Sequence, residues 1–292
     1  METVEEKFIR VKHFCNLGDA IASLAGLKKY YEITGKKIIF CQQINIAASY
    51  YEGATHPTLS DGVQVMMNNR MLEMVTPLLL AQEYIAGVEI YNGQKIDIDL
   101  DVIRSKVFVN IPHQAIQQWI FMAYPDLAAD LSKAWISVNK NEVDVSDCKL
   151  CYTNLPATEF PVGDFKDKVI VNFTERYRNH TINYYFLKKY QDRLIFAGTE
   201  NEKKIFCDKW ELDIPYLKVN NFLQLTTIIK ESKFLLSNQS MAWNIAESIK
   251  SKRILELCQY AANCQSFIGE DSYGFYHQVG VEYYVEKLMN KI

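Results

Sequence analysis

The sequence predicts an α/β fold made of two Rossmann-like domains, each built on a parallel sheet. The chain has 292 residues, of which 49% are hydrophobic and 23% are charged, and this is enough for two packed cores. A strand–helix–strand unit opens the first half, and short apolar strands alternate with helical stretches in the second half. Between residues 139 and 166 the periodicity fades among Pro, Asp and Asn residues, which indicates a domain boundary.

The first half begins with a strand, a helix and a second strand, and we assign residues 1–150 to an N-terminal Rossmann-like domain. The strands are expected at residues 8–14 and 36–41, with the helix at about 19–33. Further β-rich runs lie at 88–91, 95–101 and 106–110, and helical spacing occurs at 69–84 and again after Pro112.

The second half alternates more regularly, and we assign residues 165–275 to a C-terminal Rossmann-like domain. Strands are predicted at 168–173, 193–198, 214–219, 233–238 and 253–258, separated by helices near 181–191, 201–210, 222–232 and 240–250. Right-handed crossovers then give a parallel sheet covered on both faces. Residues 276–292 form a last amphipathic helix, expected to pack back toward the first domain. We expect both sheets to face a central cleft, where ligands bind.

Charge and composition narrow the possible partners. The formal net charge of −3 gives no long-range attraction for a polyanion, so nucleic acid is possible but not favoured. No apolar stretch approaches the roughly 18 to 20 residues that span a bilayer, and the first residues do not resemble a signal peptide. Seven scattered cysteines favour reduced thiols. We therefore expect a soluble, cytoplasmic protein without a transmembrane segment.

The segment FCNLGDAIAS, residues 14–23, places an acid where the first strand gives way to the first helix. Gly18 is expected to relieve the tight turn, and Asp19 to lie at or just inside the helix N-terminus. Asp19 then either caps the helix, worth about 1 kcal/mol, or acts as a general base that takes a proton from an acceptor hydroxyl group. Asn16, Gly18 and His113 are further candidates for the cleft.

Two loops of the second half suit phosphate groups. The loop after the strand at 168–173 carries Thr174, Arg176 and Arg178, and guanidinium groups beside a helix N-terminus favour an anion. The alternative is an ordinary solvated loop. The loop after the strand at 233–238 contains the second set, which is Ser237, Asn238, Gln239 and Ser240.

Backbone amides and the Ser240 hydroxyl group of that second loop suit another phosphate, and the loop has no acid that would repel it. Ser240 is equally suited to be a helix N-cap, and the two roles are compatible. Glu200 and Glu202 follow the strand that ends at Gly198, where an acid either binds ribose hydroxyl groups or favours the first turn of a helix.

Several familiar motifs are absent or weak. Asp97, Asp99 and Asp101 alternate along a β-like run and need not converge, and Cys148 with Cys151 is a lone CxxC pair, so we expect no metal site. The sequence has no GxGxxG, GxxxxGK[ST] or GxSxG motif. A nicotinamide dehydrogenase, a P-loop ATPase and an esterase therefore each lack their central motif.

The segment NLGDAIASLAGLKKY resembles the N-terminal segment of the lipopolysaccharide heptosyltransferases, glycosyltransferase family 9. In the second half, NFTERYRNHTINYYFLKKY, LIFAGTENEKKIF and FLLSNQSMAWNIAESIKSKRILEL are similar in order and spacing to three segments of that family. These are its phosphate loop, its Gly-then-acid segment and its final nucleotide loop. The resemblance is loose over the first 40 residues and closer over residues 168–258. It implies a GT-B fold and metal-independent, inverting sugar transfer. In that fold residues 1–150 would form the acceptor-side domain and residues 165–275 the nucleotide-sugar-binding domain.

The resemblance also implies roles for particular residues. Asp19 matches the family's catalytic base, and Glu202, or else Glu200, matches its ribose-binding acid. The matches in the phosphate loop are Thr174 with Arg176 or Arg178, and SNQSMAWNIA matches the diphosphate-binding loop. In that last loop the family has Asp, Gly and His where this chain has Gln239, Met241 and Asn244, so Ser240 alone keeps the hydroxyl group.

The function expected from the sequence is a metal-independent, inverting glycosyltransferase. It would use a nucleotide-diphosphate sugar as donor and a glycan hydroxyl group as acceptor, and would need no cofactor. Two alternatives remain open. One is a glycosyltransferase that acts on modified DNA bases, and the other is a catalytically silent protein that binds a nucleotide or a sugar.

Overall fold

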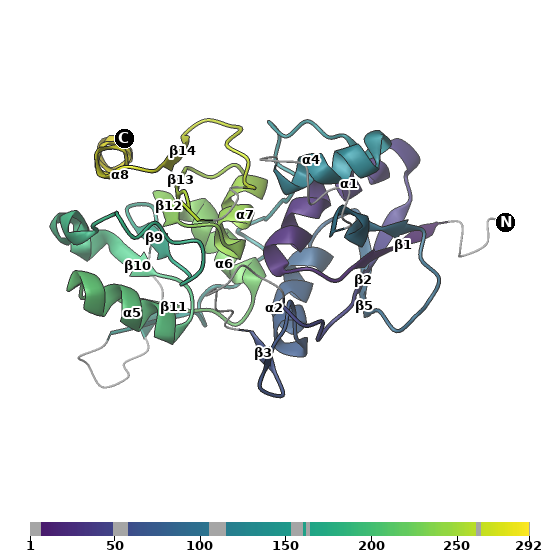
Figure 1. Cartoon of the computed structure of the whole chain (residues 1–292), viewed down its shortest axis with the longest axis horizontal. Helices are drawn as coiled ribbons and strands as arrows, with labels where there is room; N and C mark the ends of the chain where they lie inside the picture. Colours follow the sequence, from purple (N-terminus) through teal and green to yellow (C-terminus); the bar gives the residue numbers. More distant parts are fainter. Residues whose placement is uncertain are drawn as a thin grey trace. The chain divides into compact units, whose positions relative to one another are not determined.

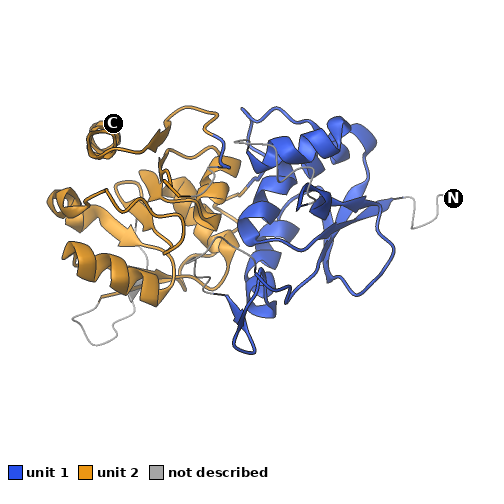
Figure 2. Ribbon diagram, viewed as in Figure 1, with its two compact units in different colours: residues 1–137, 264–266 blue, residues 138–263, 267–292 orange. Residues whose placement is uncertain are grey.

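The computed structural model divides the chain into two compact units (Figure 2). It describes residues 7–48, 58–104, 115–152, 160–161, 164–260 and 264–291. Unit 1 comprises Met1–Ser137 with Cys264–Ser266, and unit 2 comprises Val138–Asn263 with Phe267–Ile292. The division falls before the expected boundary of residue 150. The reason is β7 (Lys149–Cys151), which pairs with a strand of the second sheet and so draws its segment into unit 2.

The described strands of unit 1 form a four-stranded parallel sheet in the order β5-β2-β1-β6 (Figure 1). Their bounds are Phe8–His13 for β1, Lys37–Gln42 for β2, Ile85–Ile90 for β5 and Ile98–Asp99 for β6. A separate hairpin joins β3 (Leu59–Ser60) to β4 (Val63–Gln64). The expected strand at 106–110 lies outside the described residues.

The described helices of unit 1 are α1 (Leu17–Thr34), α2 (Asn69–Leu80) and α4 (Ile116–Ala123), with 3₁₀ turns η2 (Leu100–Arg104) and η3 (Pro125–Leu127). Two helix ends of unit 1 have a recognisable cap, which are the Asn68 N-cap of α2 and the Gly35 C-cap of α1. Helix α1 ends at Gly35, whose φ of 69° lies in the left-handed region that glycine adopts without strain. Gly26 lets α1 approach η3, since a Cβ there would lie 3.3 Å from the Cβ atom of Leu127.

The described strands of unit 2 form an eight-stranded sheet in the order β14-β13-β12-β9-β10-β11-β7-β8. The five parallel strands expected from the sequence are present as β9 (Val169–Asn172), β10 (Leu194–Phe196), β11 (Tyr216–Lys218), β12 (Phe234–Ser237) and β13 (Arg253–Glu256). Three further strands were not expected from the sequence, which are β7, β8 (Phe160–Pro161) and β14 (Ser272–Phe275), and β7 and β8 pair antiparallel. Every residue of β9, β12 and β13 is buried, as in a sheet covered on both faces.

The helices of unit 2 are α5 (Glu200–Trp210), α6 (Phe222–Glu231), α7 (Met241–Ser248) and α8 (Gln278–Asn290), and η4 (Tyr185–Arg193) is a 3₁₀ helix. Val281, Val285 and Leu288 of α8 belong to the core of unit 2. The last helix therefore packs within unit 2, and its expected packing toward the first domain stays a prediction. Its apolar stripe packs on β13 and β14, and β14 was not foreseen. No helix in the described part of the chain is long and apolar enough to cross a membrane.

Each sheet contains a point where the strand order reverses. In unit 1 the chain builds β2 and β5 on one side of β1 and then places β6 on the other side. In unit 2 it builds β10 and β11 on one side of β9, and then β12, β13 and β14 on the other. Ligands of open α/β sheets bind beyond the carboxyl ends of the strands at such a reversal. The ends of β1 and β6, and those of β9 and β12, are therefore where a site is expected.

Candidate functional site

In unit 1 the reversal point is lined by charged side chains that join β6 to β1. Lys12 Nζ lies 3.2 Å from Asp99 Oδ2 and 3.1 Å from Asp101 Oδ2. The backbone N–H of Phe14 donates a 2.8 Å hydrogen bond to Asp101 Oδ1. Asp99 and Asp101 thus hold the end of β1 in place, and a lysine occupies the space between them.

Asp19 lies in the first turn of α1, where it is buried and paired with a cation. Asn16 is the N-cap residue, and its side chain makes no capping hydrogen bond. Asp19 is 7% exposed, and its Oδ1 accepts a hydrogen bond from Arg104 Nη2 of η2. The interpretation of Asp19 as the helix cap is therefore wrong, although its charge still favours the N-terminal end of the helix. Gly18 lies within the first turn of α1 and does not form a separate turn.

The electrostatics of this edge follow from burial and from the Asp19–Arg104 pair. The Asp19 charge raises the pKa of Arg104 above its ordinary value, which keeps the guanidinium charged. Burial raises the pKa of the Cys15 thiol to about 12, so Cys15 accepts the 3.2 Å hydrogen bond from Arg104 Nε as a neutral thiol. Burial also raises the pKa of Asp101, against the opposing effects of His13, the Phe14 amide and Lys12.

The three alternating aspartates do not gather as metal ligands. Asp97 accepts a 2.8 Å hydrogen bond from the backbone N–H of Arg10, while Asp99 and Asp101 contact Lys12. The residues that the structure describes contain no group of three His, Cys, Asp or Glu side chains able to hold a metal ion. The described cysteines are all free, Cys148 and Cys151 included.

Three residues at this edge were not singled out from the sequence, which are His13, Gln42 and Arg104, and Asp101 was considered there only as a metal ligand. His13 ends β1, Gln42 ends β2, and their side chains are joined by a 2.8 Å hydrogen bond. Polar residues at the ends of apolar strands were the available signal. His113, the histidine chosen from the sequence, lies outside the described residues.

In unit 2 the reversal point is closed by a network of short hydrogen bonds among the ends of β9 and β12 and the start of α7. Asn172 Oδ1 accepts hydrogen bonds from Ser240 Oγ at 2.7 Å and from Ser237 Oγ at 3.4 Å. Ser240 is the N-cap residue of α7 and accepts a hydrogen bond from the backbone N–H of Trp243. The N-cap interpretation of Ser240 is confirmed, and both serine hydroxyl groups are engaged within the protein.

Asn238 connects this network to the loop that follows β9. Its Nδ2 donates hydrogen bonds to the backbone carbonyls of Thr174 at 2.9 Å and Arg176 at 2.6 Å, while its Oδ1 accepts one from the Thr174 backbone N–H at 3.1 Å. The loop turns at Tyr177, whose φ of 56° is unusual for a residue with a side chain. Asn238 therefore shapes the predicted phosphate loop through its side chain.

Arg178 is held in a buried ion pair and does not take the phosphate-binding role expected from the sequence. Its side chain is 9% exposed, its Nε donates a 2.9 Å hydrogen bond to Glu256 Oε1, and its guanidinium carbon lies 4.6 Å from the centre of the Phe173 ring. Glu256 also accepts hydrogen bonds from the Asn179 backbone N–H at 2.7 Å and from the Tyr184 hydroxyl group at 2.5 Å. This arrangement gives Arg178 a structural role in place of the predicted phosphate contact, because the ion pair fixes the loop to β13.

Glu202 completes a capping box at the start of α5. Its Oε2 accepts hydrogen bonds from the backbone N–H of Thr199 at 2.8 Å and from its hydroxyl group at 2.9 Å. The Thr199 hydroxyl group in turn accepts the Glu202 backbone N–H. Burial raises the pKa of Glu202, against the lowering effects of the Thr199 hydrogen bonds and of the Arg176 charge. The first-turn interpretation of Glu202 is confirmed, and Glu200 beside it is exposed.

The structure thus gathers most of the predicted donor-binding residues at one edge of the second sheet. Gly198 lies against this group, since a Cβ there would come within 3.1 Å of Glu202 Oε2 and 3.3 Å of Asn172 Nδ2. Gln239 is buried in the same loop, and Asn244 Nδ2 donates a 3.0 Å hydrogen bond to the Ser240 carbonyl. The first turn of α7 contains no acid, so its backbone amides face no competing carboxylate there.

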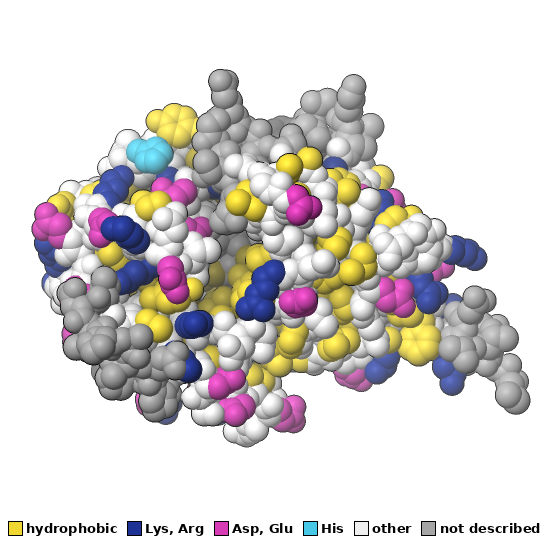
Figure 3. Space-filling view, turned by 90° about the horizontal axis from the view of Figure 1, so that it is seen from below, with side chains coloured by type: hydrophobic (Ala, Val, Ile, Leu, Met, Phe, Trp, Pro, Cys, Tyr) yellow, Lys and Arg dark blue, Asp and Glu magenta, His cyan; other side chains and the backbone are white. Residues whose placement is uncertain are grey.

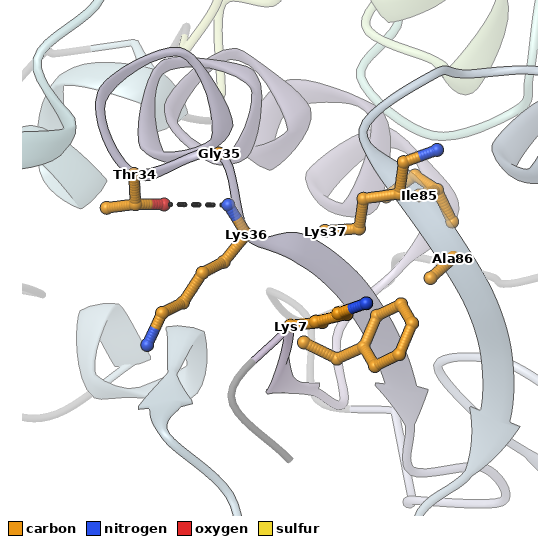
Figure 4. Close-up of a pocket in the computed structure, with 8 residues that line it drawn as sticks. Lys7, Thr34, Gly35, Lys36, Lys37, Ile85 and Ala86 are labelled. Atoms are coloured by element: carbon orange, nitrogen blue, oxygen red, sulfur yellow. Dashed lines mark hydrogen bonds between the residues drawn. The ribbon is translucent and has the colours of Figure 1, made fainter. Parts of the chain in front are cut away.

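A separate cavity of about 650 Å³ lies at the amino ends of the strands in unit 1 (Figure 4). Lys7, Lys36 and Lys37 line it, but Figure 4 shows their ammonium groups pointing in different directions. Thr34 and Gly35 place the C-terminal end of α1 beside it, and that end of a helix disfavours anions. The cavity is at the edge of the sheet opposite to His13 and Asp19, and we assign it no part of the candidate site.

The surface gives no sign of a nucleic-acid site on the face shown in Figure 3. Lys and Arg side chains there are interspersed with Asp and Glu side chains and do not form one continuous basic surface. A duplex requires several phosphate contacts from clustered cations. Nothing on this face therefore favours the alternative in which DNA bases are the acceptor.

Comparison with known proteins shows similarity in fold without similarity in sequence. No family model matches the chain, and no curated protein matches its sequence. Solved structures do match. A glycosyl transferase family 9 protein from Veillonella parvula has a TM-score of 0.54 and 10% identity, over 98% of this chain and 90% of its own.

Two heptosyltransferases of E. coli match at similar levels. WaaC with ADP-2-deoxy-2-fluoro heptose has a TM-score of 0.56 and 10% identity, over 96% of this chain and 99% of its own. ADP-heptose lps heptosyltransferase II has a TM-score of 0.51 and 10% identity, over 97% and 98% respectively. The matches extend over nearly the whole length of each chain, and the fold of this chain is therefore GT-B, as the sequence predicted.

Proposed function

We propose that the chain is a glycosyltransferase that moves a sugar from a nucleotide-diphosphate donor to a glycan hydroxyl group. The observation that carries this proposal is the GT-B fold, shared with heptosyltransferases over nearly the whole chain. Polar and charged residues at both points of strand reversal support it, because these are the positions where such sheets bind ligands. Fold alone does not determine chemistry, so the proposal depends on those residues and requires its own test.

The donor diphosphate would bind in unit 2 at the start of α7. The backbone amides of the first helical turn and the positive end of the helix dipole favour an anion there, and no acid lies in that turn. Arg176 would supply a positive charge from the loop that Asn238 holds. Arg178 is excluded from this set by its buried pair with Glu256.

The proposed reaction is inverting and does not use a metal. The acceptor oxygen attacks the anomeric carbon on the face opposite to the diphosphate, while a basic group removes the hydroxyl proton. Charge develops on the leaving diphosphate, and Arg176 with the amides of α7 would stabilise it. Unit 1 would supply the proton acceptor. Asp19 was expected in this role, but Arg104 engages one of its oxygens.

Nucleotide binding is the first test of the proposal. The unfolding midpoint would be measured by thermal shift with UDP, GDP, ADP, CMP and dTDP, each at millimolar concentration. A ligand at 100 times its Kd raises the free energy of unfolding by about 2.7 kcal/mol, which gives a clear shift. Arg176→Gln should reduce the shift, whereas Arg70→Gln, an exposed arginine of α2, should leave it unchanged. If no nucleotide raises the midpoint, the proposal loses its main support.

A second candidate function is nucleotide or sugar binding without transfer. The observation that favours it is the closed network of unit 2, in which the hydroxyl groups of Ser237 and Ser240 are hydrogen-bonded to each other and to Asn172. Those hydroxyl groups would have to exchange partners to contact a ligand. Release of nucleoside diphosphate from the best-binding sugar nucleotide distinguishes the two functions, since a silent binding protein shows a thermal shift and no release.

A further inference from the structure

His13 lies at the end of β1, at the strand reversal of unit 1, and the proposed function has given it no role so far. It is 3% exposed, and its ring packs against Phe40 with the ring centres 5.6 Å apart. Its Nδ1 lies 2.8 Å from Gln42 Oε1. A buried imidazole with one defined partner has its two nitrogens in different environments, and that difference decides which of them can accept a proton.

The hydrogen bonds of Gln42 fix the tautomer of His13. Gln42 Nε2 donates a 2.8 Å hydrogen bond to the backbone carbonyl of Gln43. The opposite orientation of the amide would place two carbonyl oxygens against each other, so Oε1 must face the histidine. Because an amide oxygen only accepts, His13 Nδ1 must carry the hydrogen. In the neutral ring the lone pair is then on Nε2.

Nε2 of His13 can accept a proton at neutral pH. Burial lowers the pKa of His13 below its ordinary value of 6.5, and although the charges of Asp101 and Asp19 and the Gln42 hydrogen bond oppose this, the net direction is downward. Arg104 adds to the lowering. Within the described ranges no residue forms a hydrogen bond with His13 Nε2. Completely buried nitrogen and oxygen atoms without a partner do occur in these ranges, but Nε2 is not one of them, so this nitrogen is not completely buried.

The carboxylates at the same edge are less able than His13 Nε2 to accept a proton, because each of them already has an oxygen atom engaged by a partner. Asp19 Oδ1 is occupied by Arg104. Asp101 Oδ1 accepts the Phe14 amide, and Asp101 Oδ2 lies 3.1 Å from Lys12 Nζ. Their charges nevertheless act on His13, and each favours its protonated form. The arrangement places a neutral base beside two carboxylates that stabilise the cation it becomes.

We propose that Nε2 of His13 accepts the proton of the attacking hydroxyl group and that Gln42 is the positioning residue that holds His13 in the required tautomer. This rests on the proposed function. The O–H bond of the acceptor breaks and its proton moves to Nε2. The acceptor oxygen forms the new bond to the anomeric carbon, and the bond from that carbon to the diphosphate breaks with its electron pair on the leaving oxygen. Asp19 and Asp101 then stabilise the imidazolium.

The tautomer is tested directly on the full-length protein, without any ligand. Nitrogen-15 NMR of the histidine side chains separates a protonated nitrogen from one with a free lone pair. The expected result at pH 7.5 is a protonated Nδ1 and an unprotonated Nε2 for His13, assigned by comparison with His13→Gln. The opposite tautomer, or a doubly protonated ring, would overturn the proposal whatever the activity shows.

The catalytic role is tested by release of nucleoside diphosphate from UDP-glucose, GDP-mannose and ADP-heptose, with water or simple glycosides as acceptor. His13→Gln should lower kcat by about 100-fold or more, the range expected for loss of a general base. It should leave the thermal shift by the nucleotide unchanged. His277→Gln is the matched control, because His277 is exposed in unit 2 and makes no side-chain capping bond to α8.

The positioning role of Gln42 has its own readout. A carboxylate in its place would still accept the Nδ1 hydrogen and would stabilise the imidazolium, so Gln42→Glu should raise the pKa of His13. The acidic limb of the kcat–pH profile should then move to higher pH, an effect that a merely structural role would not produce. If the wild type transfers sugar and His13→Gln retains kcat within threefold, this inference fails and the proposed function stands. If the wild type neither binds nucleotide nor releases it, both fail.

Discussion

The hydroxyl group of Ser240 donates a 2.7 Å hydrogen bond to Asn172 Oδ1, and this bond joins the start of α7 to the end of β9. The two residues are far apart in the sequence and meet because β12, which leads into α7, lies directly beside β9. The bond therefore fixes the helix N-terminus at the strand reversal of unit 2. It makes the backbone amides of α7 a rigid feature of the candidate donor site.

Ser240→Ala should lower both the stability of the protein and its affinity for nucleotide. The change removes an N-cap and a buried hydrogen bond, and the free energy of unfolding should fall by about 1 to 2 kcal/mol. Urea denaturation measures that loss, and the thermal shift by the best nucleotide measures affinity. Ser146→Ala is the control, because Ser146 is exposed. Normal stability in Ser240→Ala would show that the cap contributes nothing.

Arg178→Gln should be strongly destabilising. The change leaves the buried carboxylate of Glu256 without its cation, and breaking a buried pair in this way costs about 3 to 5 kcal/mol. Arg193→Gln, which breaks a more exposed pair with Asp167, should cost under about 1 kcal/mol. Chemical denaturation compares the two variants.

The double variant Arg178→Met with Glu256→Leu separates two contributions to the loss of stability. One is the cost of an unpaired buried charge, and the other is the loss of the contacts that fix the loop. The double variant removes both members of the buried pair and should recover part of the stability lost in Arg178→Gln. A folded, stable Arg178→Gln variant that fails only in nucleotide binding would instead support the phosphate contact expected from the sequence.

Glu202→Gln should change how stability depends on pH. Burial raises the pKa of Glu202 above its ordinary value of 4.5, so the folded state holds this proton more tightly than the unfolded state. The stability that Glu202 contributes is therefore greatest below pH 4.5 and falls as the pH rises through the folded pKa. Glutamine keeps the capping box with Thr199 but does not titrate.

The free energy of unfolding of the Glu202→Gln variant should consequently fall less steeply than that of the wild type between pH 4.5 and 7. Urea denaturation at several pH values gives the two slopes. Glu200→Gln is the matched control, since Glu200 is the exposed first residue of the same helix. Parallel curves for the wild type and Glu202→Gln would contradict the direction of the shift.

The sequence predicted the second sheet well, because its strands are buried on both faces and read as short, continuous apolar runs. Five of them lie within two residues of the predicted bounds. It missed β14, a short strand with Gly274 at its third position, and β7 and β8, which lie in a segment rich in Pro, Asp and Asn. The stretch predicted as a helix at 181–191 is the 3₁₀ helix η4. Pairing in the sheet, and not local propensity, determines those edge strands.

The candidate site was harder to predict than the fold. The order of strands within a sheet is not visible in the sequence, so nothing there places β6 beside β1 or brings Arg104 to Asp19. Arg178 and Arg176 look equivalent in the sequence, and only the buried position of Glu256 separates them. The loops selected from the sequence follow β9 and β12, at the strand reversal of unit 2, whereas tertiary contacts decide which of their side chains form buried pairs within the protein.

Asp19→Asn distinguishes a carboxylate base from the role inferred for His13. If Asp19 removes the proton, the variant should lose at least about 100-fold in kcat, as expected for a general base. If His13 does so, kcat at pH 8 should fall by less than tenfold. The acidic limb of the profile should also move to lower pH, because Asp19 raises the pKa of His13 and the unpaired charge of Arg104 lowers it further. Asp126→Asn, an exposed acid of η3, serves as the control. Loss of kcat without a shift of the acidic limb would return the catalytic role to Asp19.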